Sequence, residues 1–596
     1  MFLRMTKRKK DGKEHRYWSI VENHRISKKR VVQKHVLYLG EINDSQREAW
    51  WRSIEILENS KQTPRNITLF PEDRLVESGS HDVIHVHVNR MRLERPRQWG
   101  ACWMALLLWE QLQLDSYWAA KLPPSREGTR WLNILKILVS YRLIEPGSEW
   151  RCHRDWYGRS AIGDLLGEEG EVVPYQNLYR CLDKILDHKE GLFNFLKQQW
   201  QDLFNASFDV LLYDLTSTYF ECDPPEEGKR QFGYSRDKRS DCVQIVIALV
   251  ATPEGFPLAY EVMPGNTSDR TTLRQFLHKI EEQYGKARRV WIMDRGIPTE
   301  EILEEIRRSD TPIYYLVGTP KGRLNKLEAQ LLSLPWETVR DSLSVKLLQQ
   351  EDELYVLACS TSRQAKERAI RRRKLKRYWK RLHELRGQKL KRDQLLMKIG
   401  AAKTAAGNAA RLVELSVPLP HQAVTPETFS FRLCRDKLRK LRRQEGQYLL
   451  RSNLKAENPA TLWKYYIQLV QIEEAFKTIK MDLSLRPIYH QTDERIEAHI
   501  FVAFLSYCLQ ITLQQRLKVL APGLTVRSVL EKLASIQLVD VHLPTTNGKE
   551  LRLPRYTEPN KEHLLLLSKL DLHLPPQPRP ELFDKKPEML RLKMNV

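Results

Sequence analysis

Apolar and polar positions follow a regular order between residues 207 and 318. Three strand-like runs come first, and a helix, a strand, a second helix and a further strand follow them. In chain order the segments read SFDVLLYDLTSTYFE, DCVQIVIALVAT, FPLAYEVMPGN, TTLRQFLHKIEEQYG, RRVWIMD, PTEEILEEIRRS and IYYLVGT. Because strands that alternate with helices form parallel sheets, the pattern predicts an α/β domain whose sheet begins with three antiparallel strands.

The regions around this domain have other patterns. Residues 1–96 are rich in strand-like runs, with a hairpin expected from residues 17–21 and 31–39. Helical spacing in residues 97–205 predicts a DNA-binding region, for which a plain helical bundle is the alternative. Short strands around a long charged helix fill residues 319–460 and are expected to form an insertion. The expected boundaries are 1–96, 97–205, 206–318, 319–460, 461–515 and 516–596.

The order of elements is that of a ribonuclease-H-like α/β core. We therefore expect such a core to be interrupted by a β-rich and helical insertion before its last helix. A mainly helical DNA-binding region would precede it. The C-terminal region carries no recognisable chemistry, and dimerisation is one role for it.

Two carboxylates follow apolar runs of this core. Asp214 ends the run VLLYD before the turn-forming residues TST, and Asp294 ends the run VWIMD. We expect both side chains at neighbouring strand ends, where carboxylate oxygens suit a hard cation such as Mg²⁺. The alternative is that each aspartate caps the turn after its strand.

A third carboxylate lies on the helix predicted over residues 459–481. At about 100° per residue, one face of this helix forms an apolar stripe. The stripe consists of Ile472, Ala475, Phe476 and Ile479. Tyr466, Glu473 and Lys480 are spaced by seven and fall on one line beside the stripe, whereas Glu474 points away from the core. A surface Glu and Lys on an ordinary amphipathic helix are the alternative.

The segment YIQLVQIEEAFKTIK resembles the Y-x2-R-x3-E-x6-K signature of bacterial insertion-sequence transposases of the insertion-sequence-four superfamily, with Tyr466, Glu473 and Lys480 in register. Other family-like blocks follow in the family's order. They are YDLTSTYFE, GYSRDKRSD, PLAYEVMPGNTSD, IMDRGIPTEE, YLVGTPKG and RPIYH. The resemblance covers residues 207–320 and 447–510, and the start, MFLR…KKDGK…VLYLGE, is similar to one subgroup of the family.

This resemblance implies a DDE transposase that cuts the ends of a mobile DNA element and joins them to target DNA. Asp214, Asp294 and Glu473 would be its catalytic residues and would bind two Mg²⁺ or Mn²⁺ ions. Tyr466 and Lys480 would hold a phosphate near the element end. The expected partners are double-stranded DNA, as terminal inverted repeats and as target, and a second copy of the chain in the DNA complex. The sequence has no convincing P-loop, so no nucleotide cofactor is expected.

One position departs from the family signature. The signature's arginine is Leu469 here, so its phosphate contact is absent or has moved to Lys477 or Arg486. Two rival functions share the fold, namely a metal-dependent nuclease and a transposase-derived DNA-binding protein without catalysis. The long insertion and the transposase blocks argue against the nuclease, and the three retained acids argue against the inactive protein.

The net charge favours a nucleic-acid partner, with a membrane surface or plain solubility as the alternatives. The chain has 98 Lys and Arg against 75 Asp and Glu, a net charge of +23, and such a field attracts polyanions. The basic helix predicted at residues 363–392 has few acids in its first turns. Its residues Arg371, Arg372, Arg373 and Lys374 are therefore expected to contact DNA.

Other candidates carry weaker signals. His85 and His87 alternate on a predicted strand, but no third metal ligand is evident. Asp237 and Asp241, in the block GYSRDKRSD, are expected either to assist the site or to be solvated turn residues.

Three tryptophans could bind an unpaired base. Trp336, Trp379 and Trp463 are candidates to stack on a flipped base. The eight cysteines are scattered singly, which favours buried thiols in a reducing compartment. Residues 101–109 form the most apolar run and are too short for the ~20 residues of a membrane span. We expect a cytoplasmic protein with no membrane partner.

Overall fold

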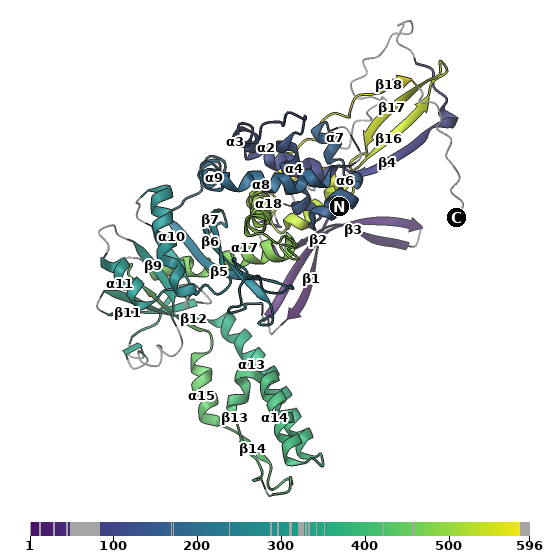
Figure 1. The fold of residues 1–596 in the computed structure, drawn as a ribbon. Helices are drawn as coiled ribbons and strands as arrows, with labels where there is room; N and C mark the ends of the chain where they lie inside the picture. The colour runs from purple at the N-terminus through teal and green to yellow at the C-terminus, as the bar shows by residue number, and fades with distance from the viewer. Residues whose placement is uncertain are drawn as a thin grey trace. The chain divides into compact units, whose positions relative to one another are not determined.

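The structure is a computed structural model. It describes residues 2–10, 13–27, 30–42, 46–47, 50, 84–168, 170, 172–237, 239–285, 289–294, 297–308, 313–319, 327, 330–331, 334–340, 343–350, 352–420, 422–455 and 458–584. The chain forms two compact units (Figure 1). Unit 1 comprises Met1–Thr6, Tyr17–Ala287 and Leu469–Val596, and unit 2 comprises Lys7–Arg16 and Arg288–Gln468.

The N-terminal residues form a three-stranded sheet of order β1-β2-β3. Its strands are β1 (Phe2–Lys10), β2 (Lys13–Ser27) and β3 (Arg30–Gly40). The antiparallel pairing of β2 with β3 confirms the predicted hairpin. β1 was not predicted, because charged residues at exposed positions hide the apolar alternation of a strand.

The region between residues 100 and 204 is mainly helical. It contains α2 (Gly100–Gln111), α3 (Leu114–Trp118), α4 (Trp131–Ile144), α5 (Glu149–Arg151), the π-helical turn η3 (Cys152–Trp156), α6 (Tyr157–Arg159), α7 (Ile162–Leu166), α8 (Tyr175–Ile185), η4 (Leu186–His188) and α9 (Lys189–Phe204). The helices α2, α4 and α8 pack against α18 (Asp493–Leu520). The helical region and the C-terminal helices therefore share one core.

Helix α18 is the central helix of this core. It is long and apolar enough to cross a membrane by length and composition alone, but 94% of its most apolar window is buried inside the protein. It is longer than the apolar run at residues 101–109. A soluble core helix has the same length and composition, so the finding is weak evidence for a membrane.

A further sheet joins one strand from near residue 95 with three strands from the C-terminal region. Its strands are β4 (Arg92–Gln98), β16 (Gln537–Pro544), β17 (Lys549–Tyr556) and β18 (Glu581–Asp584), in the order β18-β17-β16-β4. A buried ion pair between Arg97 and Asp540, at 3.0 Å, holds β4 to β16. The short helices α19 (Val526–Leu533) and α20 (Lys561–Leu570) complete the C-terminal region.

Unit 1 also contains three antiparallel strands that pair in chain order. They are β5 (Val210–Phe220), β6 (Val243–Ala251) and β7 (Pro257–Pro264), as the sequence predicts. Helix α10 (Asp269–Tyr284) covers one face, where the Tyr213 hydroxyl donates to Thr272 Oγ1 at 2.7 Å. Helix α18 covers the other face, where the rings of Tyr260 and Phe504 lie 4.6 Å apart.

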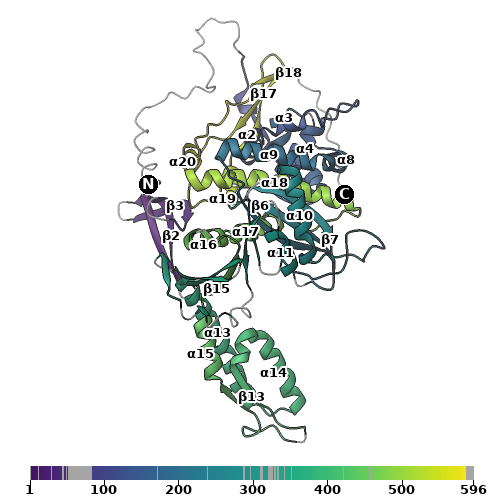
Figure 2. The same cartoon turned by 90° about the vertical axis from the view of Figure 1, so that its left-hand side faces the viewer.

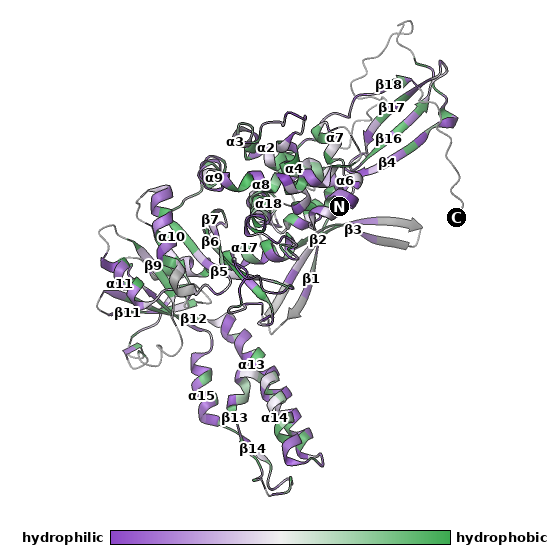
Figure 3. Cartoon of the chain, in the orientation of Figure 1, coloured by the Kyte–Doolittle hydropathy of each residue, from purple (hydrophilic) through white to green (hydrophobic). Residues whose placement is uncertain are grey.

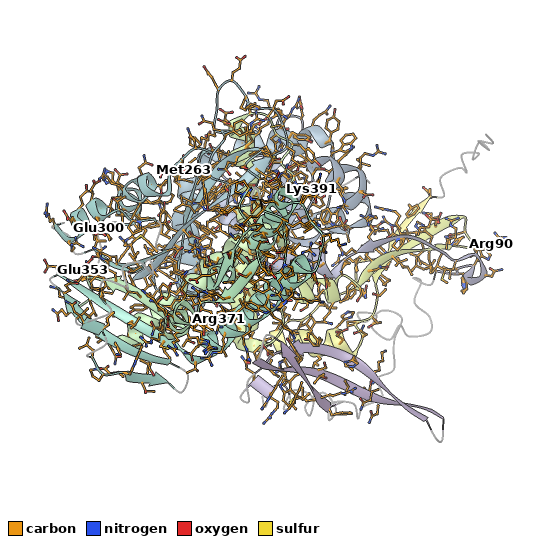
Figure 4. The ribbon with its side chains drawn as sticks, turned by 90° about the horizontal axis from the view of Figure 1, so that it is seen from below. Arg90, Met263, Glu300, Glu353, Arg371 and Lys391 are labelled. Carbon is orange, nitrogen blue, oxygen red and sulfur yellow. The ribbon has the colours of Figure 1, made fainter. Side chains whose placement is uncertain are left out.

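The strands of unit 2 pair in the order β10-β11-β12-β15-β9-β8. With the helix α11 (Glu300–Arg308), these strands are β8 (Val290–Met293), β9 (Tyr314–Gly318), β10 (Glu337–Arg340), β11 (Leu343–Gln350), β12 (Glu353–Ser360) and β15 (Gln447–Ser452). β8 and β9 are parallel, and the other pairs are antiparallel. Arg451 binds the carboxylates of Glu300 and Glu353, which Figure 4 labels, and so ties the inserted strands to α11.

The strands β12 and β15 flank a helical arm in unit 2 (Figure 2). The arm contains α13 (Thr361–Arg386), α14 (Arg392–Ala406), η5 (Gly407–Leu412), β13 (Val413–Ser416), β14 (Ser430–Leu433) and α15 (Arg435–Gln444). Its own apolar core includes Leu382, Leu395 and Phe429. The surfaces of α13 and α15 are largely hydrophilic (Figure 3). Strands and a long basic helix are thus present where the sequence predicts them.

Candidate active site

Asp214 lies in the middle of β5, not at its end. β5 continues to Phe220 and pairs with β6 throughout, with Asp214 opposite Leu249. The prediction that Thr-Ser-Thr turns the chain was wrong, because threonine and aromatic residues favour strands and this run is buried. The Asp214 side chain is half-buried within an otherwise buried stretch.

The helix that carries Glu473 is interrupted. The predicted helix over residues 459–481 consists of α16 (Pro459–Ile467), α17 (Leu469–Lys477) and the π-helical turn η6 (Thr478–Asp482). A single straight helix was therefore a wrong prediction. The break at Gln468 and the wider π turn alter the register, so Tyr466, Glu473 and Lys480 do not lie on one regular helical line.

Helix α17 packs against β5. Its predicted apolar stripe is confirmed as buried, while Glu473 is exposed beside it. Residues two apart on a strand share a face, so Asp214 and Thr216 face the same way. Thr216 lines a small apolar cavity with Phe476 and Lys480. The face of β5 that carries Asp214 therefore faces α17, the helix that carries Glu473.

The neighbouring Glu474 has different surroundings. Its charge acts on Tyr507 and Lys518 of α18. Burial lowers the pKa of Lys518, and the Glu474 carboxylate opposes this effect. Glu474 thus lies close to α18, and its electrostatic role differs from the one expected of Glu473.

Lys480 and Arg486 converge on Asp237. Lys480 Nζ lies 3.2 Å from Asp237 Oδ1, and Arg486 Nη1 lies 3.3 Å from Asp237 Oδ2. The Arg486 guanidinium also lies 4.5 Å from the ring centre of Tyr219. Burial lowers the pKa of Lys480, while Asp237 opposes that shift. Asp237 is therefore an ion-pair partner of two expected DNA-binding residues, whereas Asp241 is exposed and pairs with Arg239.

Other predicted residues fall in both units. Asp294 directly follows β8, as predicted, and is exposed in unit 2. Tyr466, also in unit 2, packs against Tyr448 at 5.8 Å between ring centres. In unit 1, Leu469 is half-buried and Lys477 is exposed, so the side chain of Lys477 is open to solvent.

The basic helix α13 does not present all four predicted cations. Arg372, Arg373 and Lys374 are exposed, but Arg371 is buried. Arg371 Nε lies 2.5 Å from Glu445 Oε1, and the two side chains are 8% and 4% exposed. The prediction that Arg371 contacts DNA was wrong, because its side chain is buried and its charge is neutralised by Glu445.

We expect Arg371→Gln to destabilise the protein by about 3 kcal/mol, because the buried Glu445 carboxylate then keeps only the longer ion pair with Arg368, at 3.6 Å. Thermal unfolding of the full chain measures this effect. Arg372→Gln, one residue away and exposed, is the control and should leave the unfolding temperature unchanged. Equal unfolding temperatures for the two variants would show that the Glu445 pair does not stabilise the arm.

The tryptophan candidates differ in exposure. Trp336 is 42% exposed with Lys346 Nζ 4.8 Å from its ring centre, Trp379 is half-buried, and Trp463 is 5% exposed. Trp463 is therefore too enclosed to receive a base as the structure stands. Trp336 is the exposed candidate.

The structure also contains a buried polar cluster that the sequence did not predict. Atoms of Glu149, His490 and His499 that can bind metals lie within 4.8 Å of one another. Arg142 Nη2 lies 3.8 Å from the same Glu149 carboxylate, so a cation already occupies this place and the cluster favours an ion-pair network. Burial alone would raise the pKa of Glu149, but the two histidines hold it well below its usual range. Distant sequence positions gave no local signal for it.

The histidines that the sequence suggested are elsewhere. His85 is exposed and His87 is half-buried, beside an isolated bridge between Val86 and Thr545. Among the residues that the structure describes, they belong to no cluster of metal-binding side chains.

Comparisons with known proteins identify the family. The family model described as Transposase DDE domain matches residues 209–509, and the one described as IS1634 family transposase, N-terminal domain, matches residues 3–65. No curated protein matches the chain. A solved structure described as the cryo-EM structure of piggyBac transposase synaptic complex with hairpin DNA is similar at 10% identity and a TM-score of 0.33, over 72% of this chain and 79% of that chain. Since the first match spans just over half of the sequence, the chain belongs to the DDE transposases of bacterial insertion sequences.

Proposed function

We propose that this transposase binds the ends of its element and catalyses metal-dependent strand cleavage and strand transfer on a ribonuclease-H-like core. Asp214, Asp294 and Glu473 are the catalytic acids in this proposal. The packing of α17 on the Asp214-bearing face of β5 is the observation that carries it. The element order of three strands, a helix, a strand, a helix and a strand also supports such a core.

The donor set fits a hard divalent cation. Asp214 is half-buried and Glu473 is exposed, so their carboxylate oxygens combine partial shielding with access for DNA. Carboxylate oxygens are the ligands that Mg²⁺ and Mn²⁺ prefer. When bound, two such ions supply activation of the attacking oxygen and stabilisation of the leaving oxygen.

The cations near the site have a separate task. Lys480 and Arg486 lie beside the Asp214-bearing strand, with Lys480 lining the same cavity as Thr216. In this proposal both side chains leave their ion pairs with Asp237 and bind a DNA phosphate instead. Lys477 is exposed on the same helix as Glu473 and adds a phosphate contact, while Tyr466 contributes to the same end of the DNA.

The partners follow from this activity. We propose that the protein acts in the cytoplasm on double-stranded terminal repeats and target DNA, as a homodimer in the DNA complex. The helical region at residues 97–205 contributes DNA contacts, and residues 516–596 contribute to dimerisation. The proposed domain boundaries remain those given by the sequence.

The test uses linear DNA that carries the inverted repeats flanking the gene. With Mg²⁺ or Mn²⁺ the full chain should cut at the repeat ends and join the freed ends to a target plasmid. EDTA should stop both steps. Cutting without joining would favour the nuclease, and binding without cutting would favour the inactive DNA-binding protein.

The exposed cations of α13 give a separate prediction. Replacing Arg372, Arg373 and Lys374 by glutamine should weaken DNA binding. Each phosphate contact that forms on binding releases about one counterion from the DNA, so each lost contact removes that contribution. The plot of log affinity against log salt should lose about one unit of slope per lost contact. Fluorescence anisotropy of a labelled duplex at several salt concentrations measures this, and an unchanged slope would place the three side chains outside the DNA interface.

A further inference from the structure

A groove lies between α13 and α14 in the arm of unit 2. Its volume is about 450 Å³, large beside the ~30 Å³ that one water molecule occupies. Four cations, one tyrosine and three alanines line it. They are Arg373, Lys374, Arg377, Arg381, Tyr378, Ala402, Ala405 and Ala406. The small alanine side chains of α14 leave the space that the cations of α13 face.

The cations of the groove lie along one face of α13. Arg373, Arg377 and Arg381 are spaced by four residues, so they stack along one stripe of the helix. Like charges at this spacing repel one another and destabilise an isolated helix. No carboxylate is among the described residues that line the groove. Arg381 Nη1 lies 2.9 Å from Glu384 Oε2, outside the groove lining, so this ion pair offsets part of the repulsion and a bound polyanion would offset more of it.

Tyr378 supplies a second, independent observation. Its side chain is 2% exposed, and within the described part of the chain its hydroxyl has no hydrogen-bond partner. A buried hydroxyl without a partner is costly. Burial also raises the pKa of Tyr378, so the hydroxyl stays protonated and able to donate. An anion in the groove would provide the missing acceptor.

We propose that this groove binds consecutive phosphates of a duplex DNA backbone, with Arg377 and Arg381 pairing with phosphate oxygens and the Tyr378 hydroxyl donating to one of them. The inference rests on the proposed function only in that DNA is the ligand. A row of arginines matches a repeating backbone better than a single small anion. The neighbouring Arg372 lies outside the groove.

A matched pair of double variants tests the groove. Arg377→Gln with Arg381→Gln removes two groove charges, and Lys376→Gln with Lys380→Gln removes two exposed charges of the same helix that do not line the groove. Anisotropy titrations of the full chain with a labelled duplex should show the salt slope falling by about two for the groove pair. The control pair should lose much less. Equal losses would reduce the groove to general surface charge and overturn the proposal.

Tyr378→Phe separates binding from folding. The variant should keep the unfolding temperature, since the hydroxyl has no partner without DNA, and should weaken DNA binding about tenfold, as expected for a lost hydrogen bond to a charged group. Unchanged DNA affinity would overturn the hydroxyl's assigned contact. A lowered unfolding temperature would also contradict it, because the hydroxyl would then have a structural partner.

The source of the phosphate is resolved by competition. Inorganic phosphate should displace DNA no better than chloride at equal ionic strength, and displacement by submillimolar phosphate would instead make the groove a site for a small anion. Cleavage at saturating DNA is measured on the same variants and should persist. Wild-type protein that binds DNA but never cuts it would refute the proposed function and leave the groove comparison intact.

Discussion

Asp214→Asn is expected to abolish metal-dependent cleavage of DNA that carries the element ends, with a loss of at least ~100-fold, as for an essential catalytic group. The substitution removes the negative charge that holds a hard cation and keeps the size of the side chain. Asp214 is half-buried on a strand that pairs with β6, so the Asp214→Asn protein should still fold. End binding should stay within a few-fold, and Asp294→Asn should behave in the same way.

Asp209→Asn is the matched control. Asp209 is exposed just before β5 and accepts a hydrogen bond from the Ser207 hydroxyl at 2.7 Å. Cleavage rates with Mg²⁺, measured on labelled linear DNA, should be normal for this variant. An Asp214→Asn protein that still cuts at a normal rate would remove Asp214 from the metal site.

Glu473→Gln should lose both cleavage and strand joining, whereas Glu474→Gln should remain largely active. The two residues have the same chemistry but different surroundings. Both are exposed on the helix that packs against β5, and the charge of Glu474 also influences Lys518 and Tyr507 of α18. The expected loss for Glu473→Gln is ~100-fold or more.

Single-turnover assays of both variants, with end binding measured in parallel, distinguish loss of chemistry from loss of DNA. Both proteins should fold and bind ends. Activity retained by Glu473→Gln and lost by Glu474→Gln would mean that the register of α17 is misread and the third acid misassigned.

The sequence predicted strands β5 to β9 well because each contains a run of apolar residues. Local runs did not determine where a strand ends, so Asp214 was placed at the end of β5 although it lies mid-strand. The break at Gln468 and the π turn at η6 were also missed, since the hydrophobic period alone assumes a regular helix.

Local sequence patterns could not predict contacts between residues that are far apart in the chain. Arg371 looked like one of four equivalent cations, but its partner Glu445 is 74 residues away. The pairing of β4 with β16 and the cluster around Glu149 likewise join remote parts of the sequence. The three acids were chosen from family blocks, which align distant residues without reference to contacts, and their shared role stays a prediction.

Binding of Mn²⁺ tests the central claim most directly, since the proposal requires Asp214, Asp294 and Glu473 to hold the same ions. Electron paramagnetic resonance of the protein bound to cleaved end DNA counts the bound Mn²⁺ at increasing concentration. Wild-type protein should bind two ions per active site, and each of Asp214→Asn, Asp294→Asn and Glu473→Gln should lose at least one of them or bind it far more weakly. Undiminished binding by any one of these variants would contradict a shared three-acid site.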